Sequence, residues 1–374
     1  MLFLSQNPIH EKTVLLRVDF NVPLNPDGSI ASDERIIQTL PTIKNLLENG
    51  NKLVIISHLG QPVNNQPSLK VVADKLSELL GLSVTFCTNY QNLPIVPIIL
   101  LENLRFDPRE KKGSSDFGQE LSKMADIFVN DAFAVAHRSD ASVTQINLPS
   151  LGGFLIEKEV KMLDMVMKSA KKPLVSIVSG AKISTKLGLI KKLLTISDTV
   201  LIGGGIANVL LKLKGVEIGQ SLGKDEIVEG FEFASNLILP IDARVLVDGK
   251  AVVRKLQEVA KTDVVLDIGP ETEILFAQII QKAQTVVWNG PLGYTENPIF
   301  ANGTKAIYSA VIEAPISIVG GGDTLSCLAN APSLSKITHL STGGGAMLEY
   351  IEKEGRLPAI NFLNNHDDLA PNLD

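Results

Sequence analysis

The sequence predicts an α/β fold in which parallel sheets are covered by helices on both faces. Short runs rich in β-branched residues alternate with helical patterns through nearly all of the 374 residues. These runs are almost continuously apolar, which is typical of parallel strands buried on both faces. Because a chain of this length exceeds one ordinary hydrophobic core, we expect two domains.

The expected strands fall into two groups along the chain. In the front half they are Val14–Val18, Leu53–Ile56, Ile98–Leu101 and Ile127–Val129, and a helix is expected near Ser32–Glu48. In the back half they are Leu174–Val178, Val200–Ile202, Val245–Val247, Val286–Trp288 and Ile316–Val319. Residues 154–170 have apolar side chains at helical spacing before Pro173, so we expect a lever helix between the two lobes. The tail after Gly355 shows little periodicity.

Charge and composition argue against several classes of protein. A net charge of −6 disfavours a nucleic-acid surface. No stretch approaches the ~20 apolar residues of a membrane helix, and the apolar run at the N-terminus is too short for a signal peptide. Cys87 and Cys327 lie far apart and lack metal-ligand spacing, which suits a reducing compartment. We therefore expect a cytoplasmic protein that binds neither nucleic acid nor membranes.

Polar residues gather where the expected strands end, which is where parallel sheets bind ligands. The front half has Arg17-Val18-Asp19-Phe20-Asn21, Ser57-His58, Glu102-Asn103-Leu104-Arg105 and Asn130-Asp131. The back half has Ser179-Gly180-Ala181-Lys182, Asn289-Gly290-Pro291 and three glycine triplets. The first group is rich in Arg, His and Asn, and the second in Gly and Lys. This change of chemistry predicts two sites on two lobes.

Each glycine triplet follows a strand-like run and precedes a segment that can be helical. The triplets are Gly203–Gly205, Gly320–Gly322 and Gly343–Gly345. Glycine lets the backbone approach a ligand closely, and a helix N-terminus offers free N–H groups to an anion. The pattern predicts phosphate binding without much side-chain charge.

The front half contains candidates for a pocket that binds an anion. They are Arg17, Asp19, Asn21, Arg35, His58, Arg105 and Arg138. Arginine suits this role because its planar fork binds two carboxylate or phosphate oxygens at once. Any one of these arginines alone is more typical of an ion-paired surface residue, and a lone histidine is more often structural.

The back half contains candidates for a nucleotide site. Lys182 and Lys186 would share one face of a helix and point toward phosphates, although a solvated face is the alternative. Asp323 could reach a metal bound to phosphate or could simply cap a helix. Glu296 could accept ribose hydroxyls or be a solvated loop residue. No Walker loop occurs, and Asn208 interrupts the dinucleotide fingerprint that begins at Gly203.

Ten ordered motifs give the chain a close resemblance to the phosphoglycerate kinase family, from Val14 to about Pro358. The front half contributes RVDFNVPL (Arg17–Leu24), SHLG-P (Ser57–Pro62), LLENLRF (Leu100–Phe106) and NDAFAVAHR (Asn130–Arg138). GAKIS (Gly180–Ser184), GGGIAN (Gly203–Asn208), LDIGP (Leu266–Pro270) and WNGPLG (Trp288–Gly293) follow. GGGDT (Gly320–Thr324) and STGGGA (Ser341–Ala346) complete the series.

The resemblance implies two Rossmann-like three-layer αβα domains with parallel sheets, joined by a hinge helix. The expected boundaries are residues 1–155 with the tail from about 356 to 374, an interdomain helix over 156–172, and residues 173–355. The front domain would bind 3-phosphoglycerate or 1,3-bisphosphoglycerate, and the back domain would bind ADP or ATP with Mg²⁺. The implied activity is reversible phosphoryl transfer from 1,3-bisphosphoglycerate to ADP in a closed cleft, and we expect a monomer.

The matching positions assign a role to each site residue. The substrate would be held by Asp19, Asn21, Arg35, His58, Leu59, Gly60, Arg105 and Arg138. The nucleotide would be held by Gly180, Ala181, Lys186, Gly204, Asn289, Pro291, Glu296, Gly321, Gly322, Asp323 and Thr324. The implied catalytic residues are Arg35, Lys182, Lys186 and Gly344, with Asp323 facing the metal.

Four positions depart from the commonest family pattern. Gln61 stands where an arginine is usual, so one cationic contact near the substrate phosphate is absent. Asp140 stands where many members have His or Gln, and it could orient Arg138 or weaken its hold on an anion. Ser179 replaces a glycine, and its β-carbon could crowd the nucleotide. Thr185 replaces an aspartate in a pattern that some bacterial members share.

The implied reaction needs no general base. The attacking carboxylate of 3-phosphoglycerate has a pKa near ~4 and is ionised at neutral pH. Two other functions remain open from the residues alone. A dehydrogenase would need the dinucleotide fingerprint that Asn208 interrupts, and a two-lobed solute-binding protein would normally be exported.

Overall fold

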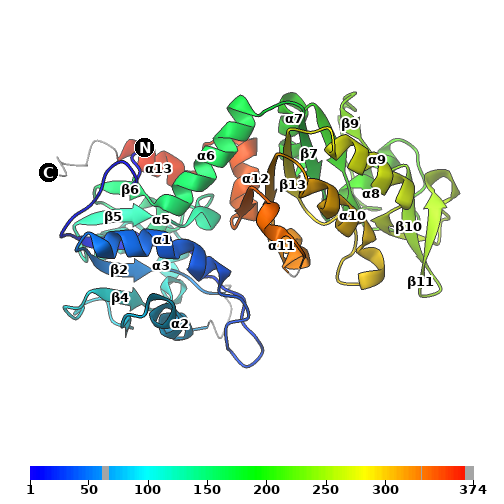
Figure 1. Ribbon diagram of the computed structural model, residues 1–374. Coiled ribbons are helices and arrows are strands. Elements are labelled where there is room, and N and C mark those ends of the chain that lie inside the picture. Colours follow the sequence, from blue (N-terminus) through cyan, green and yellow to red (C-terminus); the bar gives the residue numbers. More distant parts are fainter. Residues whose placement is uncertain (61–66, 330, 367–374) are drawn as a thin grey trace. The chain divides into compact units, whose positions relative to one another are not determined.

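The computed structural model describes residues 1–60, 67–329 and 331–366 (Figure 1). The chain divides into two compact units. Unit 1 consists of Met1–Lys161 with the segment from Gly355 onward, and unit 2 consists of Met162–Glu354. The division falls inside helix α6 (Phe154–Ser169). No helix among the described residues is both long enough and apolar enough to cross a bilayer.

Unit 1 is built on a six-stranded parallel sheet with the order β3-β4-β2-β1-β5-β6. Its strands are β1 (Thr13–Arg17), β2 (Lys52–Ile56), β3 (Thr85–Cys87), β4 (Ile98–Leu101), β5 (Ile127–Asn130) and β6 (Ser150–Gly152). Its longer helices are α1 (Glu34–Glu48), α2 (Lys70–Leu80), α3 (Pro108–Lys111), α4 (Ser115–Ser122), α5 (Ala141–Thr144) and α13 (Pro358–Asn365). Two single turns of 3-10 helix, η1 (Leu104–Phe106) and η2 (Phe133–Val135), follow β4 and β5.

Helices cover both faces of this sheet because neighbouring strand residues point to opposite faces. One core joins Val14 and Leu16 of β1 to Ile43 of α1 and Leu76 of α2. On the other face, the ring of Phe128 lies 6.2 Å from that of Phe362 in α13. Unit 1 therefore has three layers.

The tail contains a helix, α13, although its sequence shows little helical periodicity. Pro358 occupies its first turn, and the helix buries Ala359, Ile360, Phe362 and Leu363. Proline is tolerated there because the first N–H groups of a helix have no internal partner. The tail is thus a packed part of unit 1 as far as it is described.

Unit 2 contains a second six-stranded parallel sheet with the order β15-β14-β13-β7-β8-β9. Its strands are β7 (Leu174–Val178), β8 (Thr199–Ile202), β9 (Leu237–Ile238), β13 (Thr285–Asn289), β14 (Ile316–Gly320) and β15 (His339–Ser341). Its helices include α7 (Leu187–Ile196), α8 (Gly204–Leu213), α9 (Pro270–Ile280), α10 (Asn302–Val311), α11 (Gly322–Leu328) and α12 (Gly344–Glu352). The sheet core includes residues of α9, α10 and α11, whereas α7 and α12 contact one another.

One predicted strand belongs elsewhere. Residues 245–247 lie in β10 (Asp242–Val247), which pairs antiparallel with β11 (Lys250–Lys255) and β12 (Val264–Ile268). The expectation that this run joins a parallel sheet is therefore wrong. A tight turn at Asp248 and Gly249, both with positive φ, returns the chain at once into β11, so no crossover helix can follow.

Candidate functional site

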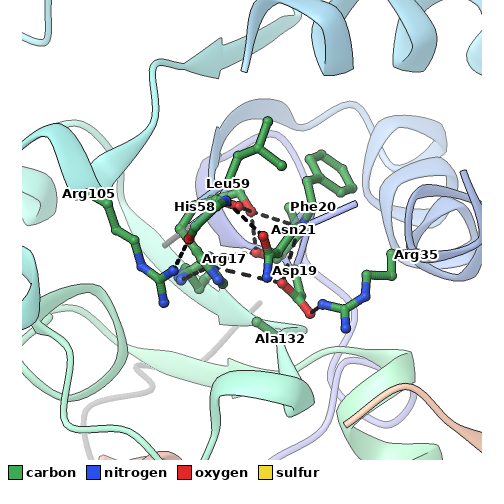
Figure 2. Close-up of polar contacts among 12 residues, drawn as sticks. Arg17, Asp19, Phe20, Asn21, Arg35, His58, Leu59, Arg105 and Ala132 are labelled. Carbon is green, nitrogen blue, oxygen red and sulfur yellow. Dashed lines mark hydrogen bonds and ion pairs between the residues drawn. The ribbon is translucent and has the colours of Figure 1, made fainter. Parts of the chain in front are cut away.

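The loops that follow β1, β2 and β4 in unit 1 form one polar cluster, which we call the basic site (Figure 2). It comprises Arg17, Asp19, Asn21, Arg35, His58 and Arg105. The structure brings these side chains together from segments up to 88 residues apart, Arg17 to Arg105. Their common position follows from the sheet, because parallel strands end at the same edge.

Direct hydrogen bonds tie the loops of the basic site to one another. The Asn21 side chain accepts a hydrogen bond from the Gly60 N–H at 2.8 Å. Asp19 is buried and forms an ion pair with Arg35, the second residue of α1. Asn103, at the start of η1, donates to the Leu59 carbonyl at 2.7 Å and accepts from the Leu59 N–H at 3.2 Å. Hydrogen bonds from side chains of one loop to the backbone of another therefore fix the positions of these loops.

Arg105 has free hydrogen-bonding capacity although it is only 4% exposed. Its Nη1 donates to the Gly60 carbonyl, while Nε and Nη2 are buried and have no hydrogen-bond partner among the described residues. Burial and the nearby Arg138 lower the pKa of Arg105 to about 10, so the group stays charged at neutral pH. A buried cation with unused N–H groups is costly unless an anion meets it.

His58 is buried beside several positive charges. The pKa of His58 lies well below its usual value. Burial is the main cause, and the positive charges of Arg17 and the other nearby arginines add to it. The ring is therefore neutral at pH 7. It can act as a hydrogen-bond donor or acceptor but contributes no charge to the site.

The remaining predicted substrate residues lie around this cluster. Arg138 follows η2, is half-buried, and its charge lowers the pKa of His58 and of Arg105. Asp140 is buried, and its charge opposes the lowering of the pKa of Arg105. Gly60 has a φ of 76°, which favours glycine. Gln61 lies outside the described residues.

The glycine triplets of unit 2 are the points where three strands give way to helices. They connect β8 to α8, β14 to α11 and β15 to α12. The last two connections touch, because a β-carbon on Gly344 would lie 2.4 Å from Cα and 2.6 Å from N of Gly321. Gly321 itself has a φ of 108°. Close backbone contact, rather than free space, requires glycine at these two positions.

Lys186 is a half-buried lysine of unit 2. Its Nζ donates to the Ser179 carbonyl and to Asn289 Oδ1, the latter at 2.7 Å. Burial lowers the pKa of Lys186 to about 8, and the charge of Asp323 partly opposes that shift. A lysine that stays mostly charged at pH 7 in a half-buried position is suited to an anion.

The expected helical pairing of Lys182 with Lys186 is wrong. Helix α7 begins only at Leu187, with Lys186 at its N-cap, and residues 183–186 form a turn closed by a hydrogen bond from the Lys186 N–H to the Ile183 carbonyl. Gly180 has a φ of 147°, which carries the chain away from helical geometry directly after β7. Lys182 is consequently exposed, whereas Lys186 folds back toward Asn289.

A cavity of about 200 Å³ lies beside these loops in unit 2. Six of the predicted nucleotide residues line it: Gly180, Ala181, Gly204, Pro291, Glu296 and Asp323. The rest of the wall is largely apolar and includes Leu211, Leu256 and Val265. An apolar wall with a few polar groups is typical of a site that takes a flat, hydrophobic ring.

Other predicted nucleotide residues hold the loops in place. Thr324 Oγ1 accepts from the Gly290 N–H at 2.8 Å, and Asn289 donates to the Gly320 carbonyl at 2.8 Å. Ser179 is fully buried, and its hydroxyl donates to the Pro291 carbonyl at 2.5 Å. The serine found at the position of a glycine therefore joins the loop after β7 to the loop after β13.

Asp323 fits a metal that is bound mainly by phosphate and water. Its carboxylate is exposed in the first turn of α11. No cluster of three or more potential metal ligands occurs in the described part of the chain. Mg²⁺ keeps several waters and commonly takes only one or two protein carboxylates together with substrate phosphates.

The sequence reasoning gave no role to several residues of these sites. Ser57 and Asn103 were noted only as polar residues at strand ends, and in the structure they organise the neighbouring loops. Glu110 and Ser142 lie behind the basic site and carried no signal, because their contact depends on the packing of α3 against α5.

Comparison with known proteins identifies the family of this chain. The family model described as phosphoglycerate kinase matches residues 4–354. The chain belongs to the phosphoglycerate kinase family. It is therefore a kinase, and its reaction is the glycolytic transfer of a phosphoryl group between 1,3-bisphosphoglycerate and ADP.

Individual relatives span almost the whole chain. The phosphoglycerate kinase of Dictyoglomus turgidum is 39% identical and covers 98% of this chain and 98% of its own length. That of Chlorobium phaeobacteroides is 42% identical and covers 94% and 96%. The phosphoglycerate kinase structure from Pyrococcus horikoshii superimposes with a TM-score of 0.87 at 33% identity, covering 99% of this chain and 100% of its own. The corresponding values for the Coxiella burnetii structure are 0.84, 36%, 97% and 99%.

Proposed function

We propose that unit 1 binds the phosphoglycerate and unit 2 binds the nucleotide, and that both are brought together for direct phosphoryl transfer. The observation that carries this proposal is Arg105, a buried cation in the basic site with two nitrogens that have no partner in the described part of the chain. A guanidinium of this kind is best matched by an anion of fixed geometry, such as a carboxylate or a phosphate. No comparable cluster of arginines lines the cavity of unit 2 among the described residues.

The nucleotide fits the cavity of unit 2 for the opposite reason. Its wall is largely apolar, and close-packed glycines lie at its edge. The apolar part would receive the adenine, and Glu296 would accept hydrogen bonds from the ribose. Backbone N–H groups at the starts of α11 and α12 would face the phosphates.

Asp323 would hold Mg²⁺ that accompanies ADP or ATP. When bound, the ion supplies positive charge that offsets the charge on the phosphate oxygens. Lys186 lies near enough to Asp323 for the carboxylate charge to oppose the lowering of the lysine pKa, so the two side chains interact electrostatically.

Arg35 and Lys186 would supply the charge that the protein itself contributes to transfer. Each belongs to a different unit, so both can act on one phosphoryl group only when the two ligands meet in a closed cleft. The attacking carboxylate is already ionised, so His58 need not act as a base. The work of the residues is to orient two anions, to spread negative charge and to exclude water.

A coupled assay tests this function directly. We expect ADP to form from ATP only when both 3-phosphoglycerate and Mg²⁺ are present. Arg105→Ala should abolish saturation by 3-phosphoglycerate in the accessible range. Arg109→Ala is the matched control, because its guanidinium pairs with Asp107 and Glu120 instead. ATP turnover that is independent of 3-phosphoglycerate would refute the proposal.

We also propose that the protein is a cytoplasmic monomer. The cysteines at 87 and 327 are both unpaired, which is consistent with a reducing compartment. Light scattering during gel filtration should give a mass near 40.3 kDa. A mass twice as large would contradict the monomer.

A further inference from the structure

A line of buried polar contacts runs from Glu110 in α3 to His58 behind the basic site. Glu110 Oε1 accepts from the Ser142 hydroxyl at 2.6 Å, and Glu110 Oε2 accepts from the Ser142 N–H at 2.9 Å. The same hydroxyl accepts from Arg17 Nε at 2.9 Å. Arg17 Nη2 lies 3.3 Å from His58 Nδ1. None of these four residues is more than 2% exposed.

Arg17 is placed to act on His58 rather than on a ligand. It is completely buried, and its Nη1 donates to the Val18 carbonyl at 2.5 Å. Burial lowers the pKa of Arg17, and the charge of Glu110 is the largest of the influences that oppose this shift. A buried guanidinium needs such a partner, so Glu110 and Ser142 fix the position of Arg17.

The contact with Arg17 determines which ring nitrogen of His58 carries the proton. A guanidinium has donors but no acceptor, so His58 Nδ1 must accept. The alternative proton acceptor for Nδ1–H is Asp19 Oδ1, which lies 3.9 Å away and beyond hydrogen-bond distance. Burial and the charges of Arg17, Arg105, Arg138 and Arg35 keep the ring neutral by lowering its pKa. The single ring proton is then on Nε2.

We propose that Glu110, Ser142 and Arg17 are positioning residues that hold His58 as its Nε2–H tautomer, ready to donate to an oxygen of the bound phosphoglycerate. Arg17, His58 and Asp19 appear close together in Figure 2. The inference deepens the proposed function, since the donor matters only if the basic site binds phosphoglycerate. Tautomer selection of this kind depends on the partner of the other ring nitrogen.

The tautomer can be measured in the wild-type protein without any substrate. Histidine labelled with ¹⁵N in both ring positions gives distinct two-bond spectra for the two neutral tautomers and the imidazolium. The His58 signals are assigned by their loss in His58→Gln. We expect a neutral ring with the proton on Nε2 between pH 6 and pH 8. A proton on Nδ1, or an imidazolium at pH 7, would overturn the proposal.

Two variants test the residues behind His58. Ser142→Ala should give a mixture of tautomers and raise the KM for 3-phosphoglycerate by about tenfold, with the KM for ATP unchanged. Glu110→Gln should move the His58 signals in the same direction by a smaller amount. Ser139→Ala, at a nearby exposed serine, is the control and should change neither quantity.

The outcomes separate this inference from the proposed function. Unchanged His58 signals in both variants would overturn the positioning role, even if activity fell. If Ser142→Ala does not fold, Glu110→Gln and the wild-type spectrum still decide the question. If the wild-type ring has its proton on Nε2 but the protein does not bind 3-phosphoglycerate, the proposed function fails and the tautomer assignment stands.

Discussion

Under the proposed assignment of ligands, the two units prepare a place for an anion by opposite means. In unit 1, buried polar side chains contact one another and the loop backbone: Asp19 pairs with Arg35, Arg17 contacts His58, and Arg105 donates to the Gly60 carbonyl. In unit 2, glycines bring backbone segments together, and the half-buried Lys186 is hydrogen-bonded to Asn289 beside them. The difference suits ligands of different kinds, because a small acid needs fixed charges whereas a nucleotide offers a large ring for apolar contact.

The comparison also indicates where each site is vulnerable. A side-chain network fails when one partner is left buried and unpaired. A glycine contact fails when any β-carbon is added, because backbone atoms cannot move away cheaply. Substitutions should therefore affect one ligand and spare the other.

The largest effect is expected for Arg35→Ala. Loss of this charge should lower turnover by roughly 10²–10³, as for other groups that stabilise charge in a transition state. The dissociation constant for the nucleotide should stay within about twofold, because Arg35 belongs to unit 1. Steady-state kinetics and calorimetry with ADP measure the two quantities. Near-normal turnover at saturating substrates would exclude a catalytic role for Arg35.

A β-carbon at Gly344 should produce the next largest effect. It would meet the backbone of Gly321 at 2.4 Å, so we expect turnover to fall on the order of 10²-fold through misplacement of the loop. Gly322→Ala separates packing from ligand contact: nothing lies within 4 Å of a β-carbon there, so we expect a smaller loss than at Gly344, limited to its predicted contact with the nucleotide. Equal losses in the two variants would show that close packing is not the reason for glycine at 344.

The pH dependence of turnover should reveal Lys186. Burial lowers its pKa to about 8, so the ammonium is present below that pH and is lost as the pH rises through it. Turnover should therefore decline above about pH 8. In Lys186→Arg the residual activity should lack this decline, and an unchanged profile would assign the titration to another group.

Ser179→Gly should have the smallest effect. Removing the hydroxyl deletes its hydrogen bond to the Pro291 carbonyl, and we expect ADP to bind about fivefold more weakly. The KM for 3-phosphoglycerate serves as the internal control and should not change. Tighter binding of ADP would instead show that the β-carbon at this position crowds the nucleotide.

The sequence predicted most of the features that are local. Apolar runs of four or five residues marked strands such as β7 and β14, and glycine triplets marked the strand-to-helix junctions. Those signals are local because burial on both faces selects the residues themselves. The membership of residues 245–247 in an antiparallel sheet was not predictable in this way, since it depends on which strand pairs with β10.

The parts of the site that the sequence did not reveal depend on packing. Lys186 was expected on a helix, but the φ of Gly180 places it in a turn, where it meets Asn289 from 103 residues away. Glu110 and Ser142 are 32 residues apart and meet only because α3 packs against α5. Such contacts between distant residues leave no periodic pattern in the sequence.

Calorimetric titration of each ligand into two variants tests most directly whether the two units bind different ligands by different means. The account predicts that Arg105→Ala loses measurable binding of 3-phosphoglycerate and keeps wild-type affinity for ADP with Mg²⁺. It predicts the reverse pattern for Gly344→Ala. If either substitution weakens both ligands to the same degree, or if Arg105→Ala still binds 3-phosphoglycerate normally, the assignment of the ligands to the two units is contradicted.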